Sequence, residues 1–462
     1  MSVFGVCDGG NGADMRAIRA TISAVAPVMI TAAALALAVT GCTGSTTTII
    51  ERQGASGSQS PGGTATGTAN GGTASAPASP SAKPTPAGPA VTITPGNGAS
   101  GADPAKGITV SSPDGKLAHV TVTTSGDPVT GTFAADNSSW HSTWALNVSQ
   151  SYTVTAIAVG STGVRTTKTS TFRTLQPTGT FSTHIFEGFQ QTYGVGMPIM
   201  LTFSSPIQNK AAVERAIELK TSKRVFGAWY WDGSQTLEFR PRDYWPAHST
   251  VSFTGHFDGV QAAPGLYGYH TLTQTFNIGD SVIAVASTRT HRTQIYINGH
   301  KKYDWPVSTG KTGDDTPNGS YLTIEKANPV RMTGPGYDLL VPWSVRFTFS
   351  GDYYHDAYWS TGQQGFENVS HGCVNLSPAN AETYYKLAVP GDPVTIKGSP
   401  RPGTWDNGWT VWFLTWSQLV KGSATGQAVV AGPSGSQFVS PSALPKSKAS
   451  YPLSTAEPGN DI

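Results

Sequence analysis

The sequence predicts a mainly β protein, with two immunoglobulin-like β-sandwiches followed by a third β-rich domain that has one short helix and a small C-terminal subdomain. Short runs of alternating polar and apolar residues recur from residue 90 onward, and turn-forming residues separate them at regular intervals. Charged residues make up only 13% of the chain, whereas the β-branched and aromatic residues that strands favour are frequent. These observations together favour strands over helices.

The charge balance excludes one broad class of partner. The formal net charge is +2, and no block of lysines and arginines stands anywhere in the 462 residues. A nucleic-acid-binding protein normally concentrates basic side chains on one face or along one helix. We therefore expect no nucleic-acid partner.

The segment that begins at Met15 has the form of a secretory signal. Two arginines precede an apolar stretch over 22–39, and small residues lead to Cys42. The sequence Val-Thr-Gly-Cys that ends at Cys42 resembles a bacterial lipobox, which implies lipidation of Cys42 and attachment to the outer face of the membrane. A transmembrane anchor is the alternative, because the apolar stretch is nearly long enough to span. Both interpretations export the rest of the chain, and Met15 competes with Met1 as the true start.

Composition and pattern divide the chain into seven segments. The stretch after Cys42 has almost no large apolar side chains, so it cannot bury a core and is expected to be a disordered tether. The two sandwich-like segments are expected to act as spacers. The predicted boundaries are a signal peptide over 1–41, the tether over 42–88, immunoglobulin-like domains over 89–176 and 177–280, the third domain over 281–398, a Trp-rich subdomain over 399–422 and a disordered tail over 423–462.

Local signals predict several elements within these segments. Asn298 and Gly299 stand between two strand-like runs and form a strong hairpin signal. A helix is expected over 377–388, with Pro378 in its first turn, where a missing N–H is tolerated. A second short helix is expected over 211–219.

Four tryptophans of the Trp-rich subdomain are spaced three or four residues apart. This spacing is typical of one helix face, and we expect that face to pack against the third domain rather than to bind carbohydrate. The four are Trp405, Trp409, Trp412 and Trp416.

Cysteine usage singles out one thiol. The chain has three cysteines, and Cys7 and Cys42 lie in the export region, which leaves Cys373 alone in the exported part. Exported proteins usually pair their cysteines in disulfides. An unpaired thiol is therefore either buried and inert or chemically used.

The residues around Cys373 favour chemical use. A thiol reacts as its thiolate, and a neighbouring imidazole that takes the proton is worth roughly 10²–10⁴ in rate. His355 and His371 are both candidates for this base, and Gly372 leaves a backbone N–H uncrowded for a developing oxyanion. A helix that starts near 377 would add a positive dipole. A zinc site built from the two histidines and the cysteine is a minor alternative that lacks a clear fourth ligand.

This constellation resembles the L,D-transpeptidase family, whose YkuD-type catalytic domain carries a histidine, a gap of this length and then Ser/Thr-His-Gly-Cys-x-Asn. The resemblance extends over about 281–397, and the Trp-rich segment resembles the family's C-terminal subdomain. The matching positions are His355, Ser370, His371, Gly372, Cys373 and Asn375, with further matches at 308–311, 316–319, 391–392 and 394.

The resemblance implies a role for each of these residues. Cys373 is the nucleophile, His355 the general base, His371 an auxiliary residue and Gly372 a backbone oxyanion donor. The carbonyl of Asp356 is expected to orient His355. The implied substrate-binding residues are Tyr337, Ser370 and Asn375. Asn375 is also expected to hold the cysteine loop, and core packing is nearly as compatible with Tyr337 as substrate contact. Trp359 is expected to pack rather than to bind a ligand.

The implied reaction is two-step acyl transfer. Cys373 attacks the carbonyl after the third residue of a donor stem tetrapeptide, terminal D-Ala leaves, and an amine of an acceptor stem resolves the thioester into a 3→3 cross-link. No metal or organic cofactor is implied, and carbapenem antibiotics are expected to acylate Cys373. The alternatives are an L,D-carboxypeptidase or wall-attachment enzyme of the same family, and a non-catalytic lipoprotein that binds the cell wall.

Overall fold

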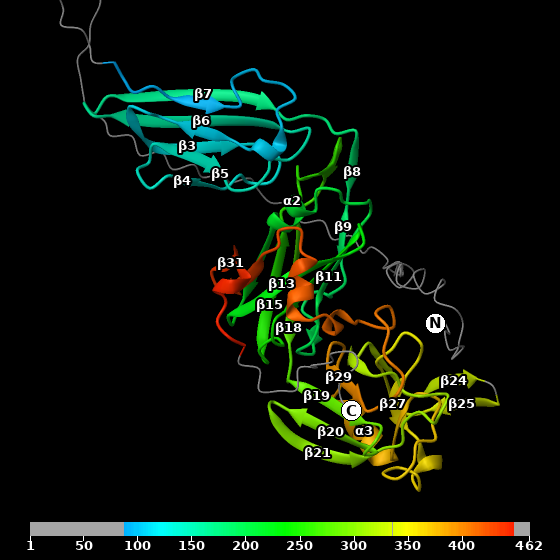
Figure 1. The fold of residues 1–462 in the computed structure, drawn as a ribbon. Coiled ribbons are helices and arrows are strands. Elements are labelled where there is room, and N and C mark those ends of the chain that lie inside the picture. Colours follow the sequence, from blue (N-terminus) through cyan, green and yellow to red (C-terminus); the bar gives the residue numbers. More distant parts are fainter. Residues whose placement is uncertain (1–86, 335, 448–462) are drawn as a thin grey trace, which may run out of the picture. The chain divides into compact units, whose positions relative to one another are not determined.

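The computed structural model describes residues 87–334 and 336–447, which are mainly β, as predicted (Figure 1). The predicted signal peptide, Cys7, Cys42, nearly all of the tether and the end of the predicted tail lie outside the described residues. Within the described part of the chain, no helix is long and apolar enough to cross a membrane.

The first domain is a sandwich of two antiparallel sheets. One sheet has the order β1-β2-β5-β4 and the other has the order β3-β6-β7. Apolar side chains from both sheets, among them Trp140, Tyr152 and Phe172, share one buried core. The elements are β1 (Thr92–Thr94), η1 (Pro104–Lys106), β2 (Thr109–Ser111), β3 (Gly115–Thr123), β4 (Gly131–Phe133), β5 (Ser139–Ser142), β6 (Ser151–Gly160) and β7 (Arg165–Arg173).

The second domain is built on a ten-stranded sheet with the order β10-β18-β15-β12-β30-β13-β14-β11-β9, in which β31 also pairs with β30. A small sheet, β16-β17-β8, and one helix complete it. The elements that precede the third domain are β8 (Gly179–Phe181), β9 (Thr183–Ile185), β10 (Thr192–Tyr193), β11 (Ile199–Phe203), α2 (Lys210–Arg215), β12 (Ile217–Thr221), β13 (Val225–Asp232), β14 (Thr236–Pro241), β15 (Ser249–Gly255), β16 (Gln261–Ala263), β17 (Leu266–Gly268) and β18 (Leu272–Ile278). The predicted helix over 211–219 is therefore one turn and a half of helix followed by a strand.

The prediction of a disordered tail from residue 423 is wrong for residues 423–447. Strands β30 (Ala428–Gly432) and β31 (Gly435–Val439) form a hairpin, and β30 lies in the middle of the second domain's sheet, between β12 and β13. A strand buried on both faces shows no polar–apolar alternation, and this apolar run is short, so periodicity gave no signal for it. A short turn, η4 (Pro441–Ala443), follows.

The Trp-rich segment packs, as predicted, but not as one helix face against the third domain. It contains the short turn η3 (Val411–Phe413) and the helix α4 (Trp416–Lys421), which Thr415 caps. Trp409 and Trp412 belong to the core of the second domain, and the Trp412 indole N–H donates to the Gly196 carbonyl at 2.7 Å. The three- and four-residue spacing of these tryptophans therefore arises in a largely irregular backbone, not along one helix.

The third domain combines two sheets, a hairpin and a helix around its own core. The sheets have the orders β21-β20-β19-β29-β22 and β23-β26-β27-β28, and β24 pairs with β25. The elements are β19 (Val282–Ser287), β20 (Arg292–Ile297), β21 (His300–Pro306), β22 (Gly319–Leu322), β23 (Glu325–Ala327), β24 (Val330–Gly334), β25 (Tyr337–Val341), β26 (Ser344–Arg346), β27 (Tyr353–Asp356), η2 (Tyr358–Ser360), β28 (Val374–Leu376), α3 (Pro378–Leu387) and β29 (Pro393–Lys397).

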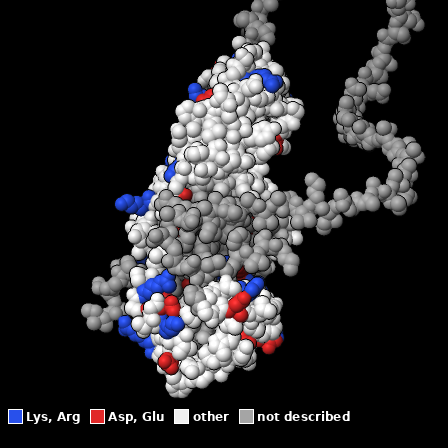
Figure 2. Space-filling view, turned by 90° about the vertical axis from the view of Figure 1, so that its right-hand side faces the viewer, with Lys and Arg blue, Asp and Glu red and all other residues white. Residues whose placement is uncertain are grey.

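Two local predictions for the third domain are confirmed. The turn between β20 and β21 consists of Asn298 and Gly299, whose positive φ angles of 48° and 89° are those that a two-residue hairpin turn requires. The helix α3 begins at Pro378 and ends one residue before Ala388. Charged side chains on the face seen in Figure 2 stand singly or in small groups of mixed sign over the described residues.

Candidate active site

Two neighbouring strands bring the histidine and the cysteine together. Strand β27 pairs in parallel with β28, with His355 opposite Asn375 and Tyr354 opposite Val374. Cys373 directly precedes Val374, so the register brings it beside the strand that carries His355. Residues two apart along a strand face the same side, so Cys373, two residues before the partner of His355, is on the face of this strand pair that carries His355.

The His355 ring is fixed in one orientation. Its Nδ1–H donates to the Asp356 carbonyl at 2.8 Å, as the sequence predicts, which leaves Nε2 as the basic nitrogen. The side chain is only 4% exposed, and this burial lowers the pKa of His355 to about 4, against a smaller opposing effect of the Asp356 hydrogen bond. The imidazole is therefore neutral at neutral pH and able to accept a proton.

Cys373 has the accessibility that a nucleophile requires. Its side chain is partly exposed, and it forms no disulfide. The thiol lies 3.8 Å from the Gly351 carbonyl oxygen, to which its S–H donates. Gly351 belongs to the turn between β26 and β27.

Hydroxyl groups hold the loop that carries Cys373. The Ser370 hydroxyl donates to the Cys373 carbonyl at 2.6 Å, and the fully buried Thr316 hydroxyl donates to the Gly372 carbonyl at 2.6 Å. Thr316 Oγ1 also accepts from the Gly310 N–H at 2.9 Å. These bonds tie the loop to the segment that follows β21.

Three sequence-predicted residues of this loop have buried positions. The Gly372 N–H donates to Ser370 Oγ at 3.2 Å, so the expectation that it is open to an oxyanion is wrong for this conformation. Ser370 and Asn375 are 7% and 3% exposed, and the Asn375 amide donates to the Ser360 hydroxyl at 2.9 Å. The bond from Asn375 joins β28 to η2, and both the loop-holding role of Asn375 and substrate contact by Ser370 and Asn375 stay predictions.

His371 and Tyr337 form the more open side of the site. Their ring centroids lie 5.1 Å apart, and Tyr337 begins strand β25. The Lys311 ammonium donates to His371 Nε2 at 3.0 Å and lies 3.4 Å from the Asp314 carboxylate. The half-buried Tyr337 lies at the site rather than in a core. The sequence motif that contains Lys311 does not indicate this contact.

Trp359 packs, as expected, but at the site rather than in a core. The indole is 45% exposed, and its ring stacks on that of His355, with centroids 5.9 Å apart and an angle of 28° between the ring planes. Tyr358 beside it is 63% exposed. Trp359 therefore covers one face of the proposed base, and only the fold reveals this.

The helix expected near 377 begins at Pro378, and strand β28 lies between it and Cys373. Across the described ranges, no group of three or more histidine, cysteine, aspartate and glutamate side chains is arranged to hold a metal ion.

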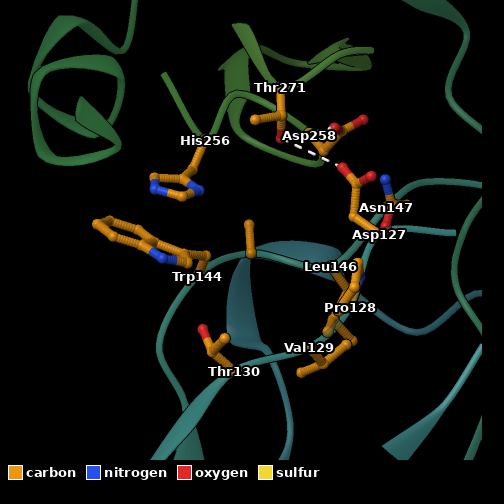
Figure 3. Close-up of a pocket in the computed structure, with 11 residues that line it drawn as sticks. Asp127, Pro128, Val129, Thr130, Trp144, Leu146, Asn147, His256, Asp258 and Thr271 are labelled. Atoms are coloured by element: carbon orange, nitrogen blue, oxygen red, sulfur yellow. Dashed lines mark hydrogen bonds between the residues drawn. The ribbon is translucent and has the colours of Figure 1, made fainter. Parts of the chain in front are cut away.

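A second cluster of ionisable groups lies outside this site, where the first and second domains meet (Figure 3). The Thr271 hydroxyl lies 3.1 Å from the Asp258 carboxylate and 3.3 Å from that of Asp127. Burial, followed by the neighbouring Asp127, raises the pKa of Asp258 to about 6. Trp144 and His256 stack at 3.9 Å beside them.

Comparison with known proteins decides the family. Residues 281–396 match the model of the L,D-transpeptidase catalytic domain, and residues 99–261 match that of a bacterial Ig domain. L,D-transpeptidase 2 of Mycobacterium tuberculosis is 33% identical over 331 residues, which cover 69% of this chain and 80% of that relative. The chain belongs to the L,D-transpeptidase family.

Further members show the same similarity. L,D-transpeptidase 5 of Mycobacterium tuberculosis is 35% identical over 69% of this chain and 73% of its own length. Among solved structures, an LD transpeptidase in complex with imipenem is 35% identical, with a TM-score of 0.41 over 48% of this chain and all of the other. L,D-transpeptidase 3 of Mycobacterium tuberculosis with a faropenem-derived adduct is 33% identical, with a TM-score of 0.39 over 46% and 97% of the two chains.

Proposed function

We propose that this L,D-transpeptidase forms 3→3 cross-links between peptidoglycan stem peptides through a thioester on Cys373. The observation that carries the proposal is the pairing of β27 with β28, which brings a partly exposed thiol beside a neutral imidazole whose Nδ1 is held by the Asp356 carbonyl. The imidazole is thereby oriented to exchange protons through Nε2 alone.

The first step forms the acyl-enzyme. Cys373 Sγ attacks the carbonyl carbon of the third stem residue while its proton passes to His355 Nε2. The resulting oxyanion collapses, the bond to terminal D-Ala breaks, and the imidazolium gives its proton to the departing amine. Because burial disfavours the charged imidazole, His355 returns this proton readily.

The second step releases the cross-linked product. The side-chain amine of an acceptor stem attacks the thioester and passes a proton to His355, and the Cys373 thiolate leaves and is protonated again. If water attacks instead, the same acyl-enzyme gives a tripeptide, and the protein acts as a carboxypeptidase. We expect His371, which contacts Lys311 and Tyr337, to meet the peptides as they enter.

The cell-wall location and the inhibitors belong to the same proposal. We expect Cys42 to carry a lipid that anchors the exported chain at the membrane, with its catalytic domain acting in the wall. Carbapenems should acylate Cys373, since one similar family member has been seen in complex with imipenem and another with a faropenem-derived adduct.

The test is incubation of the purified protein with a disaccharide-tetrapeptide, followed by mass spectrometry. A cross-linked dimer that has lost D-Ala supports the proposal, tripeptide alone supports the carboxypeptidase, and unchanged substrate supports a non-catalytic wall-binding protein. Cys373→Ala should abolish both product and carbapenem adduct, whereas Glu382→Gln, at an exposed position on α3, should leave both unchanged. An adduct that persists in Cys373→Ala contradicts the assignment.

A further inference from the structure

The turn between β26 and β27 lies against the cysteine loop. It spans residues 347–352 and is closed by hydrogen bonds from the Phe347 N–H to the Asp352 carbonyl, at 3.0 Å, and from the Gly351 N–H to the Thr348 carbonyl, at 3.3 Å. The Gly351 carbonyl accepts the Cys373 S–H. The shape of this turn therefore decides where the thiol hydrogen lies before reaction.

One carboxyl group is packed between this turn and the cysteine loop. Asp352 is 6% exposed, and its Oδ2 accepts from the Thr348 hydroxyl at 2.7 Å and from the Ser350 hydroxyl at 3.2 Å. Its Oδ1 lies so close to Gly372 that a Cβ at that position would overlap it. Gly372 has a φ of 126°, which L side chains rarely adopt, so the loop can pass this carboxyl only with glycine there.

We propose that Asp352 is a positioning residue for Cys373, which shapes the turn that receives the thiol hydrogen and places a negative charge beside the nucleophile. The proposal rests on the proposed role of Cys373 as the nucleophile. A carboxylate close to a thiol disfavours the thiolate by like-charge repulsion. Asp352 would thereby keep the resting cysteine protonated until a substrate arrives.

The surroundings of Asp352 affect whether its carboxyl group is charged. Burial raises the pKa of this carboxyl, and the hydrogen bond from Thr348 acts in the opposite direction. The other titratable or charged groups near the carboxyl and the cysteine loop come from several surrounding segments. They are His355 on β27, His371 in the loop, Lys311 and Asp314 after β21, Tyr321 on β22, Arg346 on β26, and Arg401.

Asn407, in the Trp-rich subdomain, also contacts the turn between β26 and β27. Asn407 is 4% exposed, its carbonyl oxygen accepts from the Ser350 N–H at 2.7 Å, and its amide donates to the Ser350 hydroxyl at 2.9 Å. Ser350 in turn donates to Asp352. A chain of contacts thus links the Trp-rich subdomain to the nucleophile, and Asn407 perturbs the turn without removing the Asp352 charge.

The experiment measures alkylation of Cys373 by iodoacetamide between pH 5 and 10, followed by mass spectrometry of the peptide that contains it. Asp352→Asn keeps the shape of the side chain and removes the charge, and we expect the midpoint of the pH–rate profile to fall by roughly half to one pH unit. Glu382→Gln removes a negative charge from the exposed face of α3 and should not move the midpoint. Coincident profiles for Asp352→Asn and wild type would overturn the proposal.

Two further variants separate the charge from the fold. Asn407→Ala should slow cross-link formation about tenfold without a change in KM or in the alkylation midpoint, because it loosens the turn and leaves the Asp352 charge in place. Unchanged turnover would show that Asn407 does not help to position Cys373. If the circular dichroism of Asp352→Asn differs from that of wild type, Ser350→Ala tests the effect of the charge instead. Loss of the Ser350 hydroxyl removes a hydrogen-bond donor to the Asp352 carboxylate and disfavours its charged form. The midpoint of the alkylation profile should therefore fall, as expected for Asp352→Asn. Alkylation requires no peptide substrate, so it tests Asp352 even if wild-type protein forms no cross-link, which is the result that contradicts the proposed function.

Discussion

Thr316 offers the sharpest test of how the cysteine loop is held. Its buried hydroxyl bridges two backbone groups, because it accepts from the Gly310 N–H and donates to the Gly372 carbonyl. Thr316→Val keeps the volume of the side chain and removes both bonds. Each lost bond contributes about 1 kcal/mol net, and each buried group left without a partner costs about 1–3 kcal/mol.

These magnitudes predict a loss of about 2–4 kcal/mol in the free energy of unfolding of the third domain. The Gly372 carbonyl directly precedes Cys373, so the loop should also shift, and a misplacement of about 1 Å lowers turnover roughly 100-fold. Thermal unfolding by calorimetry and acylation of Cys373 by a carbapenem, followed by mass spectrometry, measure the two effects.

Thr183→Val is the matched control. The Thr183 hydroxyl is buried without a hydrogen-bond partner among the described residues, in the second domain, so its replacement by a methyl group should not lower stability and should leave acylation unchanged. If Thr316→Val unfolds and reacts like this control, the hydroxyl bridge does not hold the loop.

Three further predictions follow from buried contacts. Gly372→Ala should abolish acylation of Cys373, measured by mass spectrometry, because the new Cβ would overlap the Asp352 carboxyl; wild-type acylation would contradict the close approach. Glu214→Ala should lower the free energy of unfolding by about 3–5 kcal/mol and speed hydrogen exchange in β30. The reason is that this fully buried carboxylate accepts from the Trp231 indole, the Ser423 hydroxyl and three further donors of 424–425. Unchanged hydrogen exchange would show that Glu214 does not hold the segment before β30. Asp258 has a raised pKa, so its contribution to stability is present below about pH 4 and is lost as pH rises through about 6; Asp258→Asn should therefore raise the melting temperature at pH 7.5 but not at pH 4, and an equal shift at both would refute this assignment.

The sequence predicted best what is local along the chain. The hairpin at Asn298 and Gly299 and the helix after Pro378 depend on turn and capping chemistry within a few residues. The pairing of His355 with Cys373 as base and nucleophile stays a prediction, and what the structure adds is that β27 and β28, which carry or flank them, are adjacent parallel strands. The orienting role of the Asp356 carbonyl follows from the residue next to His355.

What the sequence did not predict depends on contacts between distant segments. Strand β30 has no alternating pattern because it is buried on both faces, and its partners β12 and β13 lie about 200 residues earlier. Thr316 and Asn407 are a threonine and an asparagine in segments of little periodicity, and only the fold shows that they reach the cysteine loop and its neighbouring turn. Hydrogen bonds of this kind leave no periodic pattern.

For the reaction proposed above, the resting geometry requires substrate to rearrange the site before chemistry begins. The Cys373 S–H donates to the Gly351 carbonyl, and the Gly372 N–H donates to Ser370 Oγ. Proton transfer to His355 requires the first of these bonds to break, and stabilisation of an oxyanion by Gly372 requires the second to be exchanged. Breaking these two bonds costs free energy, which interactions formed only in the transition state have to offset. Reactivity in such a site depends on the turn and loop that hold Cys373 as much as on the imidazole.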